Sequence, residues 1–165
     1  MPEKRTIEKA REDAREGKAP STQAGEFVRE EMEHIREGRH GARSTSQAIA
    51  IGLSKARRAG VDLPPPKKGQ AKRRTRKSAE YAYAAGQGKR RPRRRPRVAR
   101  AVGTALKREP GSAASPAALS RQAKSAAARR PAAARKAAAR KAAQTKGARG
   151  RSAAARKAAR TRAHG

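Results

Sequence analysis

Positive charge is very unevenly distributed along this chain, and the distribution limits what the chain can fold into. Residues 63–165 carry 32 lysines and arginines against two acidic residues, Glu80 and Glu109, whereas residues 1–62 carry 13 basic and 11 acidic side chains. Aromatic residues make up only 2% of the chain. A sequence with so much net charge and so few large apolar side chains cannot bury enough surface to fold as one packed domain. The sequence therefore predicts a small folded head followed by a basic tail.

The predicted fold class is mainly α: a small N-terminal helical hairpin followed by a largely disordered, conditionally helical basic tail. Residues 1–19 are expected to form a charged helix or arm, and residues 20–62 the hairpin head. Residues 63–70 are expected to form a Pro-rich linker, and residues 71–165 the basic, Ala/Lys/Arg-rich nucleic-acid-binding tail. Three consecutive prolines mark the linker, because proline disfavours helix and favours extended polyproline II.

Two helical patterns make up the predicted hairpin. In the first, one apolar face contains Ala24, Phe27, Val28, Met32 and Ile35, and an acidic stripe opposite contains Glu26, Glu30, Glu33 and Glu37. The second begins with a capping box at Ser44 and Gln47 and ends at Gly60, where Val61 can complete a Schellman motif. About 40 residues is small for an independently folding unit. The head is therefore expected to be marginally stable or to self-associate through residues 20–62.

The second helix of the hairpin also allows a helix-turn-helix interpretation. Residues 47–58 would then lie in the major groove of DNA, with candidate head contacts at Arg43, Gln47, Lys55, Arg57 and Arg58. The turn of about six residues is longer than the three or four usual in that motif. A structural or dimerising role for the head is therefore the favoured hypothesis. The acidic stripe is interpreted as a solvated face, with retention of the protein's own basic tail as the alternative.

The tail contains helical signals, but its last part has no apolar face. Residues 72–85 and 98–106 have helix-forming patterns, and Ser115 with Pro116 is typical of the start of another helix, which Pro131 ends. Beyond it, the run Ala-Ala-Ala-Arg-Lys begins at residues 132, 137 and 153. A five-residue period advances by about 140° per repeat, so the charges wind around the helix axis. We expect this tail to be disordered alone and helical on a polyanion.

The basic tail predicts binding to nucleic acid, with double-stranded DNA as the expected partner. Each phosphate that a cation neutralises releases a condensed counterion, so affinity should fall with salt at a log–log slope of roughly −0.9 per contact. Phosphate contacts position a protein without reading sequence, so we expect little sequence discrimination. The predicted contacts are Lys89, Arg90, Arg91, Arg93, Arg94, Arg95, Arg97, Arg135, Lys136, Arg140, Lys141, Arg156 and Lys157.

A proline–arginine segment of the tail resembles a minor-groove motif. The sequence Lys89-Arg90-Arg91-Pro92-Arg93-Arg94-Arg95-Pro96-Arg97 is similar to the AT-hook, whose Pro-Arg-Gly-Arg-Pro core lies extended in the narrow minor groove of AT-rich DNA. Arg94 stands where that core has glycine, and its side chain obstructs close approach to the groove floor. Plain phosphate contact is therefore favoured over a preference for AT-rich DNA.

Two broader resemblances lead in the same direction. Residues 25–32, 38–44 and 47–61, which include Gly25-Glu26-Phe27-Val28 and Gly38-Arg39-His40-Gly41, resemble a bacterial family of unknown function over roughly residues 20–65. Members of that family are commonly labelled DNA-binding, with no established mechanism or catalytic residues. The Ala/Lys/Arg composition of residues 89–165 is similar to bacterial histone H1-like proteins and to linker-histone C-terminal domains. Both resemblances imply a DNA-binding role.

Several other function classes find no support in the residues. The chain contains no cysteine, which excludes disulfides and thiolate chemistry. No nucleophile–base pair or phosphate-cradling glycine loop is present, so we predict no enzyme, no cofactor and no small-molecule substrate. His34 lies four residues after Glu30, and His40 follows in the turn, but this spacing matches no established metal site and none is predicted. The start of the chain lacks a secretory signal, and its longest apolar run, residues 48–53, falls far short of the roughly 20 residues of a membrane span.

Together these features predict a non-enzymatic, nucleoid-associated, histone-like protein of the cytoplasm that neutralises phosphates and compacts or bridges DNA. The alternative is an RNA- or ribosome-associated basic protein. Modules that bind single-stranded RNA usually stack bases on aromatic side chains, which this chain has in short supply. No membrane partner is expected, because the tail offers alanine rather than the bulky apolar residues of membrane-active helices.

Overall fold

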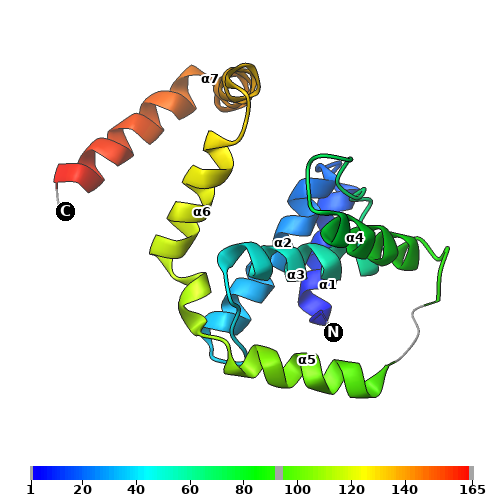
Figure 1. Ribbon diagram of the computed structural model, residues 1–165. Coiled ribbons are helices and arrows are strands. Elements are labelled where there is room, and N and C mark those ends of the chain that lie inside the picture. The colour runs from blue at the N-terminus through cyan, green and yellow to red at the C-terminus, as the bar shows by residue number, and fades with distance from the viewer. Residues whose placement is uncertain (1, 92–94, 164–165) are drawn as a thin grey trace. The chain divides into compact units, whose positions relative to one another are not determined.

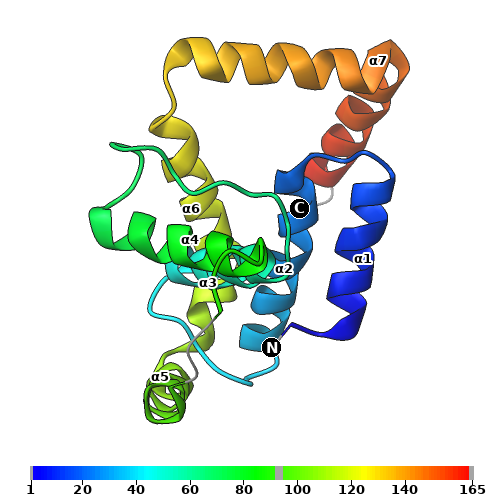
Figure 2. The ribbon, with the colours of Figure 1, turned by 90° about the vertical axis from the view of Figure 1, so that its right-hand side faces the viewer.

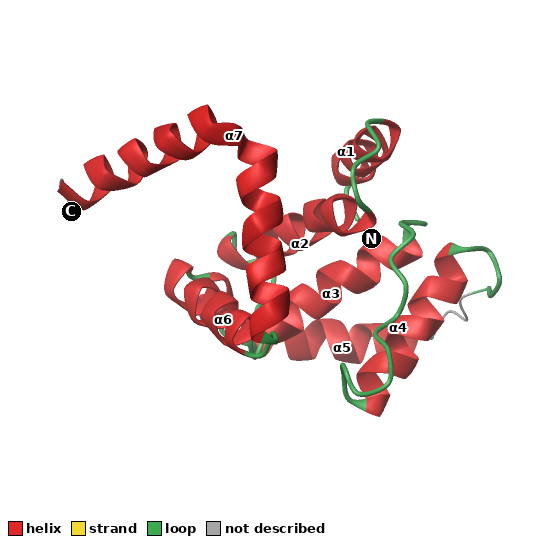
Figure 3. Cartoon of the chain, turned by 90° about the horizontal axis from the view of Figure 1, so that it is seen from above, coloured by secondary structure: helices red, strands yellow, loops and turns green. Residues whose placement is uncertain are grey.

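The computed structural model describes residues 2–91 and 95–163, and these residues are mainly α-helical. Helices account for 73% of the chain, and no strand occurs in the described ranges (Figure 3). The helices are α1 (Lys4–Arg15), α2 (Pro20–Arg36), α3 (Thr45–Arg58), α4 (Arg73–Gly86), α5 (Pro96–Arg108), η1 (Gly111–Ala114, a 3-10 turn), α6 (Pro116–Ala128) and α7 (Ala132–Ala163) (Figure 1). The chain divides into two units, residues 1–122 and residues 123–165, which are described separately here. The predicted mainly α class is confirmed.

The predicted hairpin is present, and two further helices enlarge it. Helix α2 packs against α3, while α1 lies along α2 and α4 packs on α3 (Figure 2). One apolar cluster contains Ala10, Ala24, Phe27, Ala56 and Val61, and a second contains Met32, Ile35, Ala42, Ala48, Ala113 and Ala114. Most of these side chains are alanines, so the helices approach closely and the buried apolar volume stays small.

Local signals in the sequence set both ends of α3. The Ser44 hydroxyl accepts a hydrogen bond from the backbone N–H of Gln47 (3.2 Å), which confirms the predicted cap. The Gln47 side chain accepts from the N–H of Arg43 (3.0 Å), one residue before the partner that a capping box would use. At the other end, Gly60 has a φ of 95° and the N–H of Val61 donates to the Ala56 carbonyl (3.2 Å). This is the predicted Schellman motif.

The end of α5 and the segment after it return to the head, which was not predicted from the sequence. The N–H of Gly41 donates to the Leu106 carbonyl (2.8 Å), and the Thr45 hydroxyl donates to the Ala113 carbonyl (2.7 Å). The Arg36 guanidinium donates to the carbonyl of Ala114 (3.0 Å). A β-carbon at position 41 would collide with the Glu109 carbonyl, so this contact requires glycine. Residues 71–122, predicted as tail, therefore form part of the first unit.

The Pro-rich segment lies inside the first unit and not between the two units. The Nε atom of Arg57 donates to the Leu63 carbonyl (3.0 Å), and the same guanidinium reaches the Pro64 carbonyl (3.4 Å). Leu63 packs against the apolar cluster around Phe27. Helix α4 follows on α3 directly after this segment. The prolines therefore turn the chain so that α4 can pack on the head.

The expectation of a largely disordered tail is wrong. Helices α4, α5 and α6 occupy the three stretches in which helical patterns were found, and the Ser115 hydroxyl caps α6 by accepting from the Ala118 N–H (3.2 Å). The Ala/Lys/Arg repeats form α7, in which Gly147 (φ 62°) separates two helical segments. Alanine, lysine and arginine are strong helix formers, and the backbone hydrogen bonds of a helix need no packing partner. Residues 132–163 are thus helical, not disordered.

Candidate nucleic-acid interface

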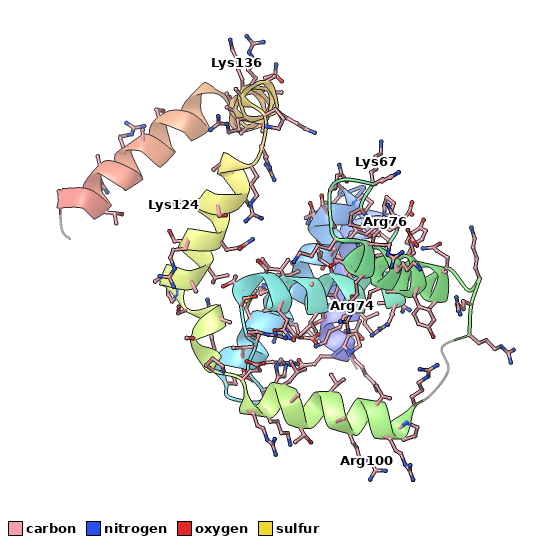
Figure 4. The ribbon with its side chains drawn as sticks, viewed as in Figure 1. Lys67, Arg74, Arg76, Arg100, Lys124 and Lys136 are labelled. Atoms are coloured by element: carbon pink, nitrogen blue, oxygen red, sulfur yellow. The ribbon has the colours of Figure 1, made fainter. Side chains whose placement is uncertain are left out.

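Lysine and arginine side chains cover the surface that follows the Pro-rich segment. Of the lysines and arginines after residue 66 whose side chains the structure describes, all are exposed except the half-buried Arg76. In Figure 4, Lys67 and Arg100 point away from opposite edges of the first unit. The charge therefore spreads over several faces instead of forming one patch, and such a surface suits contact with a polyanion from more than one side.

Few carboxylates offset this charge. Glu80, in α4, lies 3.3 Å from the Nε atom of Arg76, and Glu109 lies 3.9 Å from the Nε atom of Arg43. The other 11 acidic residues belong to residues 1–62. Several of them pair there, as Glu3 does with Arg39 (2.8 Å) and Glu30 with Lys55 (3.0 Å). The head thus neutralises much of its own charge, while the rest of the chain does not.

The segment that resembles an AT-hook is only partly described. Pro92, Arg93 and Arg94 lie outside the described residues, so the motif's central positions cannot be placed. Pro96 and Arg97 belong to the first turn of α5, so the expectation of an extended backbone is wrong at these two positions. Proline suits the first turn of a helix because its missing N–H has no partner there.

Three of the predicted contacts meet at a groove beside α5. Arg90, Arg91 and Arg95 line this groove of about 1010 Å³, whose other wall includes Val98 and Leu106 from α5. Val98 and Val102 are roughly half exposed, at 54% and 52%. Lys89 is exposed in the turn after α4. The groove combines arginines with an apolar wall, and Arg58 of α3 also lines it, a long-range contact that the sequence did not reveal.

The predicted contacts of the second unit lie on α7. Arg135, Lys136, Arg140, Lys141 and Arg156 are exposed, and the side chain of Lys157 is outside what the structure describes. Every described side chain of α7 is exposed apart from the half-buried Ala143. The five-residue repeat therefore presents cations around the whole helix, as the sequence predicted.

Two of the five candidate head contacts, Lys55 and Arg57, have partners inside the head. Arg43 and Arg58 are exposed and Gln47 is half-buried, but Lys55 and Arg57 are engaged inside the head. The Lys55 ammonium lies 2.7 Å from Glu31 and 3.0 Å from Glu30, whose side chains are 0% and 3% exposed. Arg57 is buried against the Pro-rich segment, and desolvation lowers its pKa. The expectation that these two cations face solvent or a ligand is wrong, which weakens the helix-turn-helix interpretation.

The acidic stripe is not a fully solvated face either. Glu30 is buried, because the start of α1 covers it and the backbone N–H of Glu3 donates to its Oε2 atom (3.0 Å). Desolvation raises the pKa of Glu30, but hydrogen bonds from Thr6, the Glu3 N–H and Lys55 outweigh it, and the pKa lies below its ordinary value. Arg29 pairs with Glu26 (2.6 Å) on the same helix. The partners of these carboxylates therefore come from residues 1–62 and not from the basic tail.

The three aromatic residues are all used within the chain. Phe27 is fully buried in the head core. The Tyr83 hydroxyl donates to Asp62 (2.6 Å), and this bond to the carboxylate raises the Tyr83 pKa. The Arg90 guanidinium lies over the Tyr81 ring, 4.8 Å from its centre. This arrangement leaves little aromatic surface for stacking on bases.

One cluster in the head combines residue types that bind metal ions. Glu31, His34 and His40 each offer a ligand atom, and these atoms lie within 4.8 Å of one another. The four-residue spacing pairs His34 with Glu30, but in the structure its neighbour is Glu31. The missed signal is the three-residue spacing of Glu31 and His34, which places both on one face of a helix.

Comparisons with known proteins reach only the first part of the chain. A model for a family of unknown function (DUF6496) matches residues 3–68. That range covers α1, α2, α3 and the Pro-rich segment, so the predicted resemblance to a family of unknown function is confirmed and extends further than expected. The family's description assigns no activity or ligand. No curated protein and no solved structure matches the chain.

In residues 2–91 and 95–163, none of the helices combines the length and the apolar character needed to cross a bilayer.

Proposed function

We propose that this chain is a non-enzymatic, histone H1-like, nucleoid-associated protein that binds double-stranded DNA through phosphates and compacts or bridges it. The observation that carries the proposal is the near-complete exposure of the described lysines and arginines after residue 66, with only two carboxylates among them. A polyanion stabilises such a surface by replacing its repulsion with ion pairs and by releasing condensed counterions. The distribution of cations over several faces favours bridging of two duplexes.

Binding is proposed to be largely independent of base sequence. Cations that wind around α7 contact phosphates from any orientation, and phosphate contacts carry no sequence information. The RNA- or ribosome-associated alternative receives less support, because Phe27 is buried and both tyrosines are engaged within the chain. Recognition of single-stranded RNA usually needs free aromatic rings.

The test is a titration of the full-length chain into labelled duplexes of equal length, one AT-rich and one GC-rich, at several KCl concentrations. We expect the logarithm of affinity to fall linearly with the logarithm of salt, with a slope of at least about −5, equivalent to six or more phosphate contacts. The two duplexes should bind within about threefold of each other. Affinity that does not change with salt would contradict the proposal, and stronger competition by RNA than by duplex DNA would favour the alternative.

A further inference from the structure

The turn between α2 and α3 brings three metal-binding side chains together. Glu31 and His34 are three residues apart on α2 and share one face of the helix, and His40 belongs to the turn. A glutamate followed three residues later by a histidine supplies ligands in metal-binding helical bundles for the same geometric reason. Helix and turn thus place one carboxylate and two imidazoles within 4.8 Å of one another.

The Glu31 carboxylate gives this cluster a second, independent feature. Its side chain is 0% exposed, and Lys55 lies 2.7 Å from one oxygen, Oε2. Neither oxygen has a hydrogen-bond partner among the described residues, and both are buried, so Oε2 has only the ion pair with Lys55 and Oε1 lacks even that. Its neighbour is the Nε2 atom of His40, at 3.4 Å. A buried carboxylate oxygen without a donor is costly, so it points to a missing positive group.

The other ring nitrogen of His40, Nδ1, has a partner of its own, and this partner shows which kind of positive group fits between His40 and Glu31. The Nδ1 atom of His40 lies 3.1 Å from the Gly41 carbonyl, an acceptor, so Nδ1 carries the proton. In neutral His40 the Nε2 atom therefore presents a lone pair toward Oε1 of Glu31. Two acceptors face each other, and a cation between them satisfies both. An imidazole that donates its other N–H to a backbone carbonyl is also the usual arrangement of a metal-ligating histidine.

We propose that Glu31, His34 and His40 form a site for a divalent transition metal ion, with Zn²⁺ as the best-fitting ion. Two nitrogens and one carboxylate oxygen suit zinc, which takes three protein ligands and a water molecule in open tetrahedral sites. Magnesium and calcium prefer all-oxygen sets, so the two imidazoles count against them. The ligands are Oε1 of Glu31, Nε2 of His40 and one ring nitrogen of His34.

Metal binding here would fasten the turn on which the first unit depends. His40 directly precedes Gly41, whose N–H bonds to the Leu106 carbonyl (2.8 Å). An ion held by α2 and by this turn would limit the turn's movement and strengthen the docking of the segment after α5. This inference is independent of the proposed DNA binding, because none of its three ligands is one of the predicted DNA contacts.

The test is a titration of chelator-treated full-length protein with Co²⁺, followed by displacement with Zn²⁺. We expect ligand-field absorption typical of low-coordinate Co²⁺ at one equivalent, its loss on adding Zn²⁺, and a higher unfolding temperature with Zn²⁺ present. His40→Ala and the nearly isosteric Glu31→Gln should each weaken binding at least about tenfold. His164→Ala, which changes the histidine outside the cluster, is the matched control and should bind as the unchanged chain does.

Several results would overturn the inference. Unchanged Co²⁺ binding in His40→Ala and Glu31→Gln would place the ion elsewhere, and loss of binding in His164→Ala would do the same. Absence of Co²⁺ and Zn²⁺ binding by the unchanged protein, with its helical circular dichroism intact, would leave a proton on His40 as the balancing cation. Circular dichroism of each variant separates loss of ligands from loss of fold.

Discussion

The Nζ atom of Lys55 lies 2.7 Å from Oε2 of Glu31, whose side chain is fully buried between α2 and α3. The same ammonium reaches Oε1 of Glu30 at 3.0 Å. One lysine thus contacts two buried carboxylates. Removing one partner of a buried ion pair destabilises a protein by far more than the intact pair stabilises it, because the remaining charge stays buried without compensation.

Lys55→Met is therefore expected to destabilise the head by about 3 kcal/mol or more. The methionine side chain preserves most of the apolar stem but leaves Glu30 and Glu31 without their cation. Urea unfolding followed by circular dichroism measures the change. Arg58→Met is the matched control, because Arg58 is an exposed cation on the same helix and should change stability little. Equal effects of both substitutions would contradict the importance of the buried pair.

The cost of Lys55→Met should depend on pH. The pKa of Glu30 is below its ordinary value, so its contribution to stability is present above the pKa of the unfolded chain and is lost as pH falls through the folded value. Burial lowers the pKa of Lys55, but its pairs with Glu31 and Glu30 outweigh burial and raise it. The contribution of Lys55 is therefore present below the unfolded pKa of about 10.4 and is lost only as pH rises through the folded value.

The measurement compares the unfolding free energies of the unchanged chain and Lys55→Met between about pH 7 and about pH 3. We expect the difference between the two proteins to shrink in acid, as Glu30 becomes protonated and no longer needs the ammonium. A difference that is constant over this range would show that Lys55 stabilises the head through its carbon stem and not through charge.

Close packing of α2 and α3 depends on Gly52. A β-carbon at this position would lie 2.7 Å from the Cα atom of Val28, which is backbone and cannot rotate away. Gly52→Ala should therefore cost about 1–3 kcal/mol. The control is Gly25→Ala in α2, where a β-carbon meets nothing within 4 Å and alanine should stabilise the helix by up to about 1 kcal/mol. Thermal unfolding that moves in the same direction for both would contradict this account of the contact.

Cations of α7 should contribute more to DNA binding than cations of α1. The triple variant Arg135→Gln, Lys136→Gln, Arg140→Gln removes three exposed charges from a helix that has no acidic residue. The matched variant Lys4→Gln, Arg5→Gln, Arg11→Gln removes three exposed charges from the nearly neutral head. We expect the first to reduce the log–log salt slope by roughly 2 to 3 and the second to change it little. Equal reductions would show that only net charge matters.

Sequence reasoning located the helices better than their contacts. Ser44, Gly60 and Ser115 mark helix ends by local hydrogen bonds or backbone conformation, so their roles could be predicted from neighbouring residues. The apolar face from Ala24 to Ile35 was predicted for the same reason, because helical periodicity is visible in one short segment.

Apart from the cluster of Glu31, His34 and His40, the contacts that were not predicted join residues far apart in the sequence. Nothing near Lys55 indicates that it meets Glu31, and nothing near Thr45 indicates the Ala113 carbonyl. The tail was wrongly expected to be disordered for another reason: a shortage of apolar surface was taken to mean disorder, although alanine-rich backbone forms helix without burial. Gly41 was an available signal, because a glycine at a tight turn can mark the close approach of another backbone.

The return of residues 106–114 to the α2–α3 turn decides where this protein can be shortened. Ending the chain at residue 62 would strip away the carbonyls that accept from Gly41, Thr45 and Arg36, and would uncover the alanines that Ala113 and Ala114 shield. A fragment of residues 1–62 would lose both the cover of its apolar core and the cations of the tail. A loss of DNA binding by this fragment would not show which of the two losses caused it. A stop codon after Gln122 removes α7 and the last residues of α6 while keeping these bonds, and so separates the two effects.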